Sequence, residues 1–264
     1  MSAQTILITG ATDGIGRATA KALVKAGHQV LIHGRSADKL AATRDELGLP
    51  QSATYAADLS DMREVTSLAQ RVAADHPRLD VLINNAGVYT VAAPRTDDGL
   101  DVRFVVNTLA PYVLTRALLP QLDERARVVN LSSAAQAPVD LQALAGARAL
   151  TDSDAYAQSK LALTAWSRHL AEQPDAPIVL AVNPGSMLAT KMVAKAYGVA
   201  GADVSRGAEV LSRAALDPAF AERSGSYFDN DHGRFAAPHP DALDPAKTRA
   251  LIAALDALAE RLMT

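Results

Sequence analysis

The sequence predicts an α/β protein: a doubly wound fold with a mostly parallel sheet of about seven strands and helices on both faces. Short apolar runs alternate along the chain with longer segments of helical periodicity. The short runs are mostly free of charge, which suits strands that are covered on both faces. No linker-like stretch divides the 264 residues. We therefore expect a single domain over residues 1–264, with the parts before and after about residue 130 serving different roles.

Expected strands occur along the whole chain, but their alternation with helical segments becomes less regular after residue 184. Seven segments have the length and composition of strands: 5–9, 29–33, 53–57, 79–84, 126–131, 177–182 and 225–230. Amphipathic stretches such as "IGRATAKALVKAG" lie between them, and some end in the Gly that favours a helix C-terminus. Ligands of open α/β sheets bind beyond the carboxyl ends of the strands. The residues that follow each strand are therefore the candidate site.

Composition excludes several classes of function. The formal net charge is −3 with scattered Lys and Arg, which gives no basic footprint for nucleic acid. Cysteine is absent, which excludes disulfides and thiol catalysis. We find no apolar run of the ~18 residues needed to span a bilayer, and no basic-then-apolar leader before "TILITG". We expect a cytoplasmic protein without a membrane span.

The first predicted strand leads directly into "TGATDGIGRATA". Gly10, Gly14 and Gly16 open a helix there, and glycines let backbone N–H groups approach a phosphate at the positive end of the helix. A plain strand–helix turn is the alternative. The position after the first of several parallel strands favours a dinucleotide-binding turn.

A second feature is "DAYAQSKLAL", in which Tyr156 and Lys160 are four residues apart on an expected helix. That spacing brings two side chains to one helical face, with Cβ atoms roughly 5–6 Å apart. The pair is either an ordinary surface contact or a phenol tuned by an ammonium for proton transfer.

The spacing Gly-x-x-x-Gly-x-Gly resembles the turn of the short-chain dehydrogenase/reductase family, and the resemblance continues in register. Asp58-Leu59 is similar to the family's adenine-binding pair, and Asn84-Asn85-Ala86-Gly87 matches its Asn-Asn-Ala-Gly motif. Pro184-Gly185 matches its nicotinamide-side loop. Coverage is good to about residue 190. The resemblance implies a Rossmann fold, an oxidoreductase and a nicotinamide cofactor.

The resemblance also assigns roles to single residues. The implied catalytic residues are Asn107, Ser133, Tyr156 and Lys160. The expected cofactor-binding residues are Gly10, Thr12, Asp13, Gly14, Ile15, Gly16, Arg35, Ser36, Asp58, Leu59, Asn85, Ala86, Gly87, Tyr156, Lys160, Pro184, Gly185 and Thr190. No metal is expected.

The end of the second strand indicates NADP(H). Gly34 stands where NAD-dependent relatives carry Asp, and Arg35 can accommodate a 2′-phosphate. Ser36 can cap the next helix and donate to phosphate, while Asp38 is expected inside the first helical turn. The alternative is that Arg35 only covers the surface and Ser36 only caps. His33 either borders the adenine ribose or is solvated.

In the resemblance, Tyr156 is the general acid in carbonyl reduction and the base in alcohol oxidation. Moving its pKa from about 10 to roughly 7 requires ~4 kcal/mol. A unit charge at ~4 Å supplies ~4 kcal/mol at an effective dielectric constant of ~20. A protonated Lys160 is therefore enough to account for this shift in the pKa of Tyr156. It would also bind the nicotinamide ribose. Ser133 would bind the substrate oxygen, with Ser132 structural, and Asn107 would hold a water near the lysine or be a buried backbone-bonded Asn.

Two departures from the family pattern concern the substrate end. The separation of Ser133 and Tyr156, 156 − 133 = 23 positions, is longer than usual. The extra stretch resembles the retinol dehydrogenase-like branch, which includes protochlorophyllide reductases and WW-domain-containing oxidoreductases; it either shapes the pocket or is a surface excursion. Thr190 lies six residues after Pro184, one more than usual, so Thr190 or Ser186 contacts the nicotinamide amide. The Gly-rich segment 198–207 could act as a lid.

The implied partner is a small carbonyl or alcohol substrate, hydrophobic by the resemblance, and a homo-oligomer is expected. A catalytically idle NADP-binding sensor is the alternative function, although all four catalytic residues are present. A sugar-nucleotide epimerase is disfavoured by the glycine spacing. His232, with Asp229 and Asp231 nearby, indicates a hydrogen-bonded turn rather than a metal site. Trp166 is expected to be a packing residue.

Overall fold

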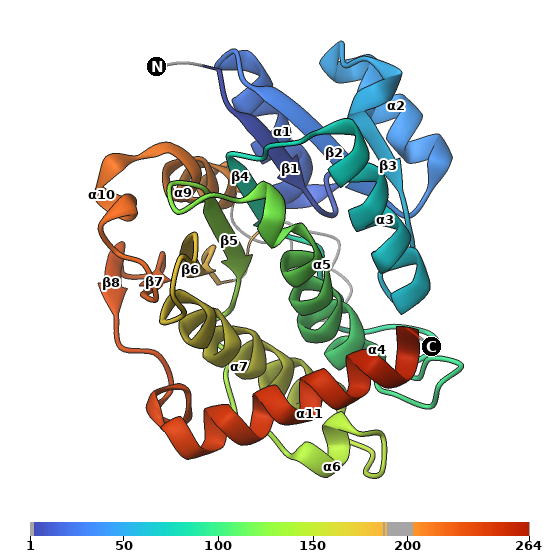
Figure 1. The fold of residues 1–264 in the computed structure, drawn as a ribbon, viewed down its shortest axis with the longest axis vertical. Helices are drawn as coiled ribbons and strands as arrows, with labels where there is room; N and C mark the ends of the chain where they lie inside the picture. The colour runs from blue at the N-terminus through green and yellow to red at the C-terminus, as the bar shows by residue number, and fades with distance from the viewer. Residues whose placement is uncertain (1–2, 187, 189–202, 264) are drawn as a thin grey trace.

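A computed structural model describes residues 3–186, 188 and 203–263 (Figure 1). The strands are β1 Thr5–Ile8, β2 Gln29–Gly34, β3 Thr54–Ala56, β4 Val81–Asn84, β5 Arg127–Leu131, β6 Ile178–Asn183, β7 Tyr227–Asp229 and β8 Arg234–Ala236. The α-helices are α1 Gly14–Lys25, α2 Ala37–Leu47, α3 Met62–Asp75, α4 Val102–Phe104, α5 Ala110–Leu118, α6 Leu141–Leu144, α7 Asp152–Ala171, α9 Ser205–Leu216, α10 Pro218–Ala221 and α11 Pro245–Met263. Short 3-10 turns cover Gln51–Ala53, Leu119–Gln121 and Pro240–Leu243, and a π-helical turn, η2, covers Val105–Leu109.

All eight strands form one sheet in the order β3-β2-β1-β4-β5-β6-β7-β8. Seven strands are parallel, and β8 pairs antiparallel with β7. The strand order reverses between β1 and β4, which is the point at which open sheets of this class bind ligands. The predicted doubly wound fold is therefore confirmed, with one edge strand more than expected.

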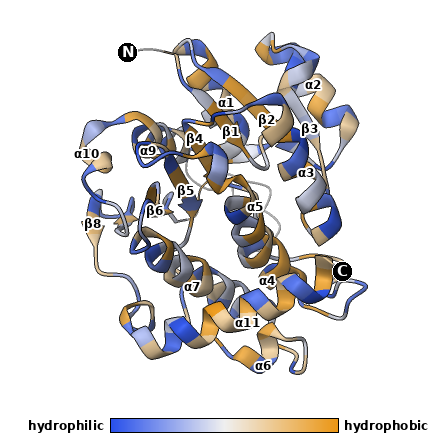
Figure 2. Cartoon of the chain, in the orientation of Figure 1, coloured by the Kyte–Doolittle hydropathy of each residue, from blue (hydrophilic) through white to orange (hydrophobic). Residues whose placement is uncertain are grey.

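The sheet separates two hydrophobic clusters because successive side chains of a strand point to opposite faces. In β1, Leu7 packs with residues of α3, α5, α7 and α11, whereas Ile6 and Ile8 pack with α1, α2 and α9. This double burial explains why the predicted strands are continuous hydrophobic runs. Figure 2 shows the opposite pattern in α11, where hydrophobic and hydrophilic residues alternate along a helix with one exposed side.

Polar side chains begin the helices that flank the candidate site. Asp13 accepts from the amide of Gly14 at the start of α1 (2.9 Å), and Ser36 accepts from the amide of Lys39 at the start of α2 (3.4 Å). Ser36 therefore has the expected capping role, and Asp38 lies in the first turn of α2 as expected. Such caps satisfy amide groups that lack a partner inside the helix.

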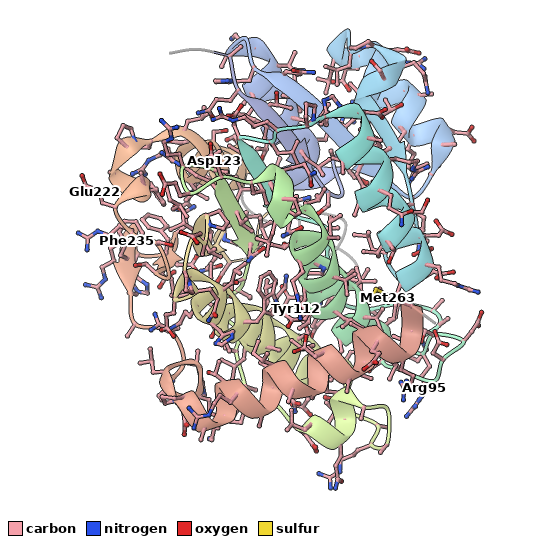
Figure 3. The ribbon with its side chains drawn as sticks, viewed as in Figure 1. Arg95, Tyr112, Asp123, Glu222, Phe235 and Met263 are labelled. Atoms are coloured by element: carbon pink, nitrogen blue, oxygen red, sulfur yellow. The ribbon has the colours of Figure 1, made fainter. Side chains whose placement is uncertain are left out.

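The stretch Val102–Gln121 is long and apolar enough to cross a membrane. However, 78% of its most apolar 18-residue window is buried inside the protein, as in a core helix. It contains α4, the π-helical turn η2 and α5. Tyr112 of α5 donates to Asp256 of α11 (2.8 Å) and packs edge-on against Trp166 of α7, with ring centroids 5.7 Å apart (Figure 3). Trp166 is thus the packing residue that the sequence predicted.

The long connection between β5 and α7 lies mostly away from the sheet edge that holds the candidate site. In Figure 1 its short helix α6 is drawn at the bottom of the view, below α11. Asp140 caps α6 and also accepts from Arg148, and Gly146 accepts from Arg95. Within the described part of the chain, Ala135 is the one residue of 134–153 on the wall of the main cavity. The surface-excursion alternative describes most of this stretch.

Candidate active site

A cavity of about 540 Å³ opens at the carboxyl ends of the parallel strands. Most of the predicted site residues line it: Gly10, Thr12, Asp13, Gly14, Ile15, Arg35, Asp58, Leu59, Asn85, Ala86, Gly87, Ser133, Tyr156, Lys160, Pro184 and Gly185. Gly16, Ser36 and Asn107 are not on its wall. Thr190 and residues 198–202 of the proposed lid lie outside the described residues, and residues 205–207 begin α9. One continuous cavity therefore joins the glycine turn to the predicted catalytic side chains.

The glycine turn is held by the Asn-Ala-Gly segment after β4. Asn85 donates through Nδ2 to the carbonyl oxygens of Thr9 (2.9 Å) and Gly10 (3.0 Å). Gly10 has φ +65°, and a Cβ there would lie 2.9 Å from Ala86 Cα. A Cβ on Gly16 would lie 2.3 Å from Asn85 Nδ2, so Gly16 permits this close packing instead of lining the cavity.

The same turn fits a dinucleotide. The first turn of α1 leaves amide groups without intrahelical partners, and the positive end of the helix dipole faces the loop. Backbone amides in this arrangement bind phosphate. The glycines bring the backbone close enough for that contact, so the chain's own residues fit the cofactor that the sequence predicts.

His33, near the end of β2, supports the glycine turn through hydrogen bonds. Its side chain is 2% exposed, so the solvated alternative is wrong. Nδ1 accepts from the amide of Gly10 (3.3 Å), and Nε2 lies 3.1 Å from the carbonyl oxygen of Ala57. Burial lowers the pKa of His33 to about 4, although the bond to Ala57 opposes that shift. The neutral ring with a proton on Nε2 fits both contacts.

Acid should therefore weaken the fold through His33. Between pH 6.5 and about 4 the unfolded chain binds a proton on this ring and the folded chain does not. Stability then falls with falling pH, by up to about 3 kcal/mol at 1.36 kcal/mol per pKa unit. We expect urea unfolding at pH 4–7 to show a shallower acid loss for His33→Phe than for the unaltered chain. Parallel pH profiles for the two proteins would contradict this role.

Arg35 and Asp58 face each other at the end of the cavity beside β2 and β3. Arg35 Nη1 is 3.7 Å from Asp58 Oδ2, and the Arg35 side chain is 77% exposed. Asp58 Oδ1 accepts from the amide and the hydroxyl of Ser60, at 2.9 and 2.7 Å. An exposed ion pair of this length contributes little to stability. The guanidinium is therefore able to exchange partners at small energetic cost.

Lys160 of α7 lies at the opposite end of the cavity from Arg35. Its side chain is buried, and Nζ donates to the carbonyl oxygen of Leu131 (2.6 Å). Burial lowers the pKa of Lys160 to about 8. Nζ is 5.7 Å from the centre of the Tyr156 ring, as helical i,i+4 spacing predicts. The pair is therefore a cavity feature and not a surface contact.

Asn107 supports this helix from η2. Its Nδ2 donates to Val88 O (2.9 Å) and to Ser159 Oγ (3.0 Å), and its Oδ1 accepts from the amide of Val88 (2.7 Å). Ser159 donates in turn to the carbonyl oxygen of Tyr156 (2.7 Å). Asn107 thus connects the loop after β4 to the helix of Tyr156. These contacts match the backbone-bonded alternative, and the π-helical turn sets the phase that allows them.

Ser132 and Ser133 follow β5 and have different surroundings. Ser132 is buried, and its Oγ lies 2.6 Å from Thr164 Oγ1, which is the structural role expected for it. Ser133 lines the cavity, and its Oγ accepts from the amide of Ala135 (3.1 Å). The carbonyl oxygen of Ser133 accepts from Tyr227 of β7 (3.1 Å). Tyr227 therefore holds the Ser133 backbone at the cavity edge.

Three residues at the site were not singled out by the sequence. Tyr89 lines the cavity and packs edge-on against Tyr156, with ring centroids 4.8 Å apart. Tyr227 contacts Ser133, and Asp231 binds Ser186 through both carboxylate oxygens. Tyr89 is two residues after Gly87, so its position beyond a strand end was the available signal. Tyr227 lies in the expected strand 225–230, and Asp231 was considered only as a neighbour of His232.

The His232 segment forms the hydrogen-bonded turn that the sequence predicted. His232 Nδ1 lies 2.6 Å from Asp229 Oδ2. Among the described residues, no group of three His, Cys, Asp or Glu side chains is arranged to hold a metal ion.

Fold and cavity together are those of the dinucleotide-binding α/β proteins, with a glycine-rich turn after β1 and the Tyr156–Lys160 pair in one cavity. A family model described as short chain dehydrogenase matches residues 4–198 of this chain. The chain belongs to the short-chain dehydrogenase family, whose fold binds a nicotinamide cofactor.

Curated relatives place the chain in the retinol dehydrogenase-like branch of that family. It is 33% identical to mouse retinol dehydrogenase 12 over 243 residues, covering 85% of this chain and 77% of the relative. It is 31% identical to human retinol dehydrogenase 13 over 275 residues, covering 94% and 82%.

Solved structures agree in fold. A protein from Mycobacterium paratuberculosis superposes with a TM-score of 0.79 at 30% identity, covering 97% of this chain and 93% of that one. A short chain dehydrogenase from Shigella flexneri, solved with NADP, gives a TM-score of 0.66 at 28% identity, covering 86% and 96%.

Proposed function

We propose that this chain is an NADP(H)-dependent oxidoreductase that transfers a hydride between the nicotinamide and a carbonyl or alcohol substrate. One observation carries the proposal: Ser133, Tyr156 and Lys160 line the same cavity as the glycine turn. When bound, the cofactor supplies or accepts the hydride. The protein then has to bind the substrate oxygen and move one proton.

Tyr156 is the group that moves the proton. In reduction its hydroxyl donates to the carbonyl oxygen as that oxygen gains charge, and in oxidation the phenolate accepts the proton of the alcohol. The Ser133 hydroxyl donates a hydrogen bond to the same oxygen and stabilises its developing charge. Both side chains lie on the cavity wall, Ser133 just beyond the end of β5 and Tyr156 near the start of α7.

Lys160 serves the phenol by charge. With its Nζ beside the Tyr156 ring and protonated, it favours the phenolate form and so makes Tyr156 a better acid. Asn107 acts through Ser159 and Val88 as a positioning residue for this helix. The four predicted catalytic residues thus divide into three that contact the cavity and one that supports them.

The cofactor preference rests on Arg35. A 2′-phosphate offers this guanidinium a stronger partner than Asp58 does, because bidentate phosphate contacts are charge-assisted. A charge-assisted hydrogen bond contributes about 1.5–3 kcal/mol, so Arg35→Ala should weaken NADPH binding about 10–100-fold and leave NADH binding unchanged. Titration calorimetry measures both affinities.

Arg63→Ala is the matched control for Arg35→Ala. Arg63 is 80% exposed and pairs with Asp61 outside the cavity, so its loss should leave the ratio of the two affinities unaltered. An unchanged NADPH affinity in Arg35→Ala would assign the cofactor preference to other residues. Solved relatives with NADP and NADPH from Shigella flexneri and Escherichia coli support the preference.

Following NADPH absorbance against aldehydes, ketones and quinones tests the reaction itself. Oxidation of NADPH with at least one carbonyl class is expected, and hydrophobic substrates are the first choice. Tight NADPH binding without turnover across the panel would favour a redox sensor instead. A cytoplasmic location, a single domain and a homo-oligomer stay predictions from the sequence.

A further inference from the structure

The loop after β6 carries the nicotinamide end of the proposed site, and a second loop holds it in place. Asn183, Pro184, Gly185 and Ser186 line the cavity in sequence. Gly185 has φ +115°, a backbone conformation that residues with a side chain rarely adopt. Such a backbone persists only where its surroundings fix it.

Residues 229–232, which we call the β7 bracket, surround this loop and begin at Asp229, the last residue of β7 that pairs with β6. Asn183 donates through Nδ2 to Asp229 Oδ1 (3.0 Å) and to Asp231 Oδ2 (2.9 Å). Asn230 donates from its amide to Asn183 O (3.2 Å) and from Nδ2 to Pro184 O (2.9 Å). The bracket therefore satisfies the backbone of the cavity loop before any ligand binds.

Asp231 makes the most specific contact of the bracket. Its Oδ1 accepts from the amide of Ser186 (2.7 Å), and its Oδ2 accepts from the Ser186 hydroxyl (2.6 Å). Partial burial would raise the pKa of Asp231, but the bonds from Ser186 and Asn183 hold it below its usual value. The carboxylate is thus ionised at neutral pH and can only accept.

This pairing decides what Ser186 can offer to a ligand. A hydroxyl has one hydrogen to donate and two lone pairs, and Ser186 donates its hydrogen to Asp231. Ser186 Oγ can therefore act toward the cavity only as an acceptor. At the nicotinamide end of a dinucleotide, the N–H₂ group of the carboxamide is the donor that matches it.

We propose that Asp231 is a positioning residue that fixes Ser186 as a hydrogen-bond acceptor for the carboxamide N–H₂ of the nicotinamide. This inference rests on the proposed function. It chooses between the two candidates that the sequence left open for the amide contact, in favour of Ser186. It also gives the "FDNDH" segment a role in cofactor binding that its loop-like pattern does not reveal.

The test removes the contact from both sides. The 3-acetylpyridine analogue of NADP⁺ has a methyl ketone in place of the carboxamide and so lacks the N–H₂ donor. Calorimetric affinities of the full chain for NADP⁺ and for this analogue give a preference ratio. We expect the unaltered chain to prefer NADP⁺ about tenfold, the order of one hydrogen bond.

In Asp231→Asn, one of the two acceptor oxygens becomes a donor and Ser186 loses its fixed orientation. The preference ratio should fall toward one, mainly through weaker NADP⁺ binding, and Ser186→Ala should give the same ratio. Combining the two substitutions should cause no further loss, because both remove one interaction.

Asp229→Asn is the matched control. It lies in the same bracket and contacts Asn183, His232 and the amide of Asp231, whereas the amide and hydroxyl of Ser186 donate to Asp231 instead. Thermal unfolding should show that both Asn variants fold and lose comparable stability, while only Asp231→Asn changes the preference ratio.

Each outcome is distinguishable. If Asp231→Asn weakens binding of NADP⁺ and its analogue equally, the residue is merely structural and the inference is overturned. If the ratio changes equally in Asp229→Asn, the bracket acts as a whole and the specific role of Asp231 is overturned. If the unaltered chain binds neither dinucleotide, the proposed function fails as well.

Discussion

Tyr156→Phe is expected to lose turnover while it keeps the cofactor. The substitution removes one hydroxyl, so the proton that the substrate oxygen needs has no positioned donor. General acid–base groups contribute about 10²–10⁴-fold to rate, and kcat should fall by that factor. The ring itself remains, with its edge-on packing against Tyr89 and its place beside Lys160. NADPH affinity should therefore change little, which stopped-flow turnover and calorimetry on the same preparation can check.

Tyr112→Phe provides the control for this experiment. Tyr112 is a phenol on α5 that donates to Asp256 of α11, away from the cavity (Figure 3). Loss of that bond should lower the free energy of unfolding by about 1 kcal/mol and leave kcat unchanged. Full activity in Tyr156→Phe would rule out the phenol as the proton donor and would leave Ser133 as the side chain to test next.

The elements that position this site could be predicted where the hydrophobic pattern of the sequence matches the burial of the residues in the fold. The parallel strands are buried on both faces, so their hydrophobicity is visible in the sequence alone. The glycine turn and the Tyr156–Lys160 spacing are local features of a strand end and a helix. Their meeting in one cavity follows from the rule that parallel strands present their carboxyl ends at one edge.

The eighth strand was not predicted because contacts with residues outside the strand support it. β8 has three residues, Arg234–Ala236, which is too short for a period to show. Its pairing is supported by Phe235, whose ring lies 5.0 Å from those of Phe220 and Phe228 (Figure 3). That aromatic group joins α10, β7 and β8, and a sequence pattern cannot place the three side chains together.

The same limit applies to the supporting contacts of the site. His33 was expected either at the adenine ribose or in solvent; it is buried between Gly10 and Ala57 on the cavity wall, contacts that no sequence pattern specifies. Asn107 is one residue in a helical stretch, and its contacts with Val88 depend on a π-helical turn that propensity does not predict. Hydrogen bonds between elements far apart in sequence require the register and the loop conformation, which only the folded chain fixes.

Lys160→Met should produce the second large effect, and it should depend on pH. The ordinary pKa of a lysine is 10.5, and burial lowers that of Lys160 to about 8. Between these values the unfolded chain holds a proton on this amine and the folded chain does not. Stability therefore rises with pH across this interval, by about 3 kcal/mol at 1.36 kcal/mol per pKa unit. Met lacks the charge, so the variant should not show this rise.

Urea unfolding of the two proteins without cofactor, at intervals from pH 7 to 10.5, measures the difference directly. Lys247→Met is the matched control with the opposite sign. Lys247 is exposed and lies 2.8 Å from Asp241, which raises its pKa, so its contribution to stability is lost as pH rises. A difference between unaltered chain and Lys160→Met that stays constant over pH 8–10.5 would contradict the burial of a titrating ammonium.

The activity of Lys160→Met tests whether the charge that destabilises the fold serves catalysis. Without the charge beside the ring, the phenolate form of Tyr156 loses its electrostatic stabilisation. The rate should then fall at neutral pH and the pH optimum for alcohol oxidation should move to higher pH. Below about pH 8 the ammonium is charged although its burial destabilises the fold. A side chain that only packed against Leu131 would be better uncharged, so the destabilising charge is itself an argument that Lys160 serves Tyr156.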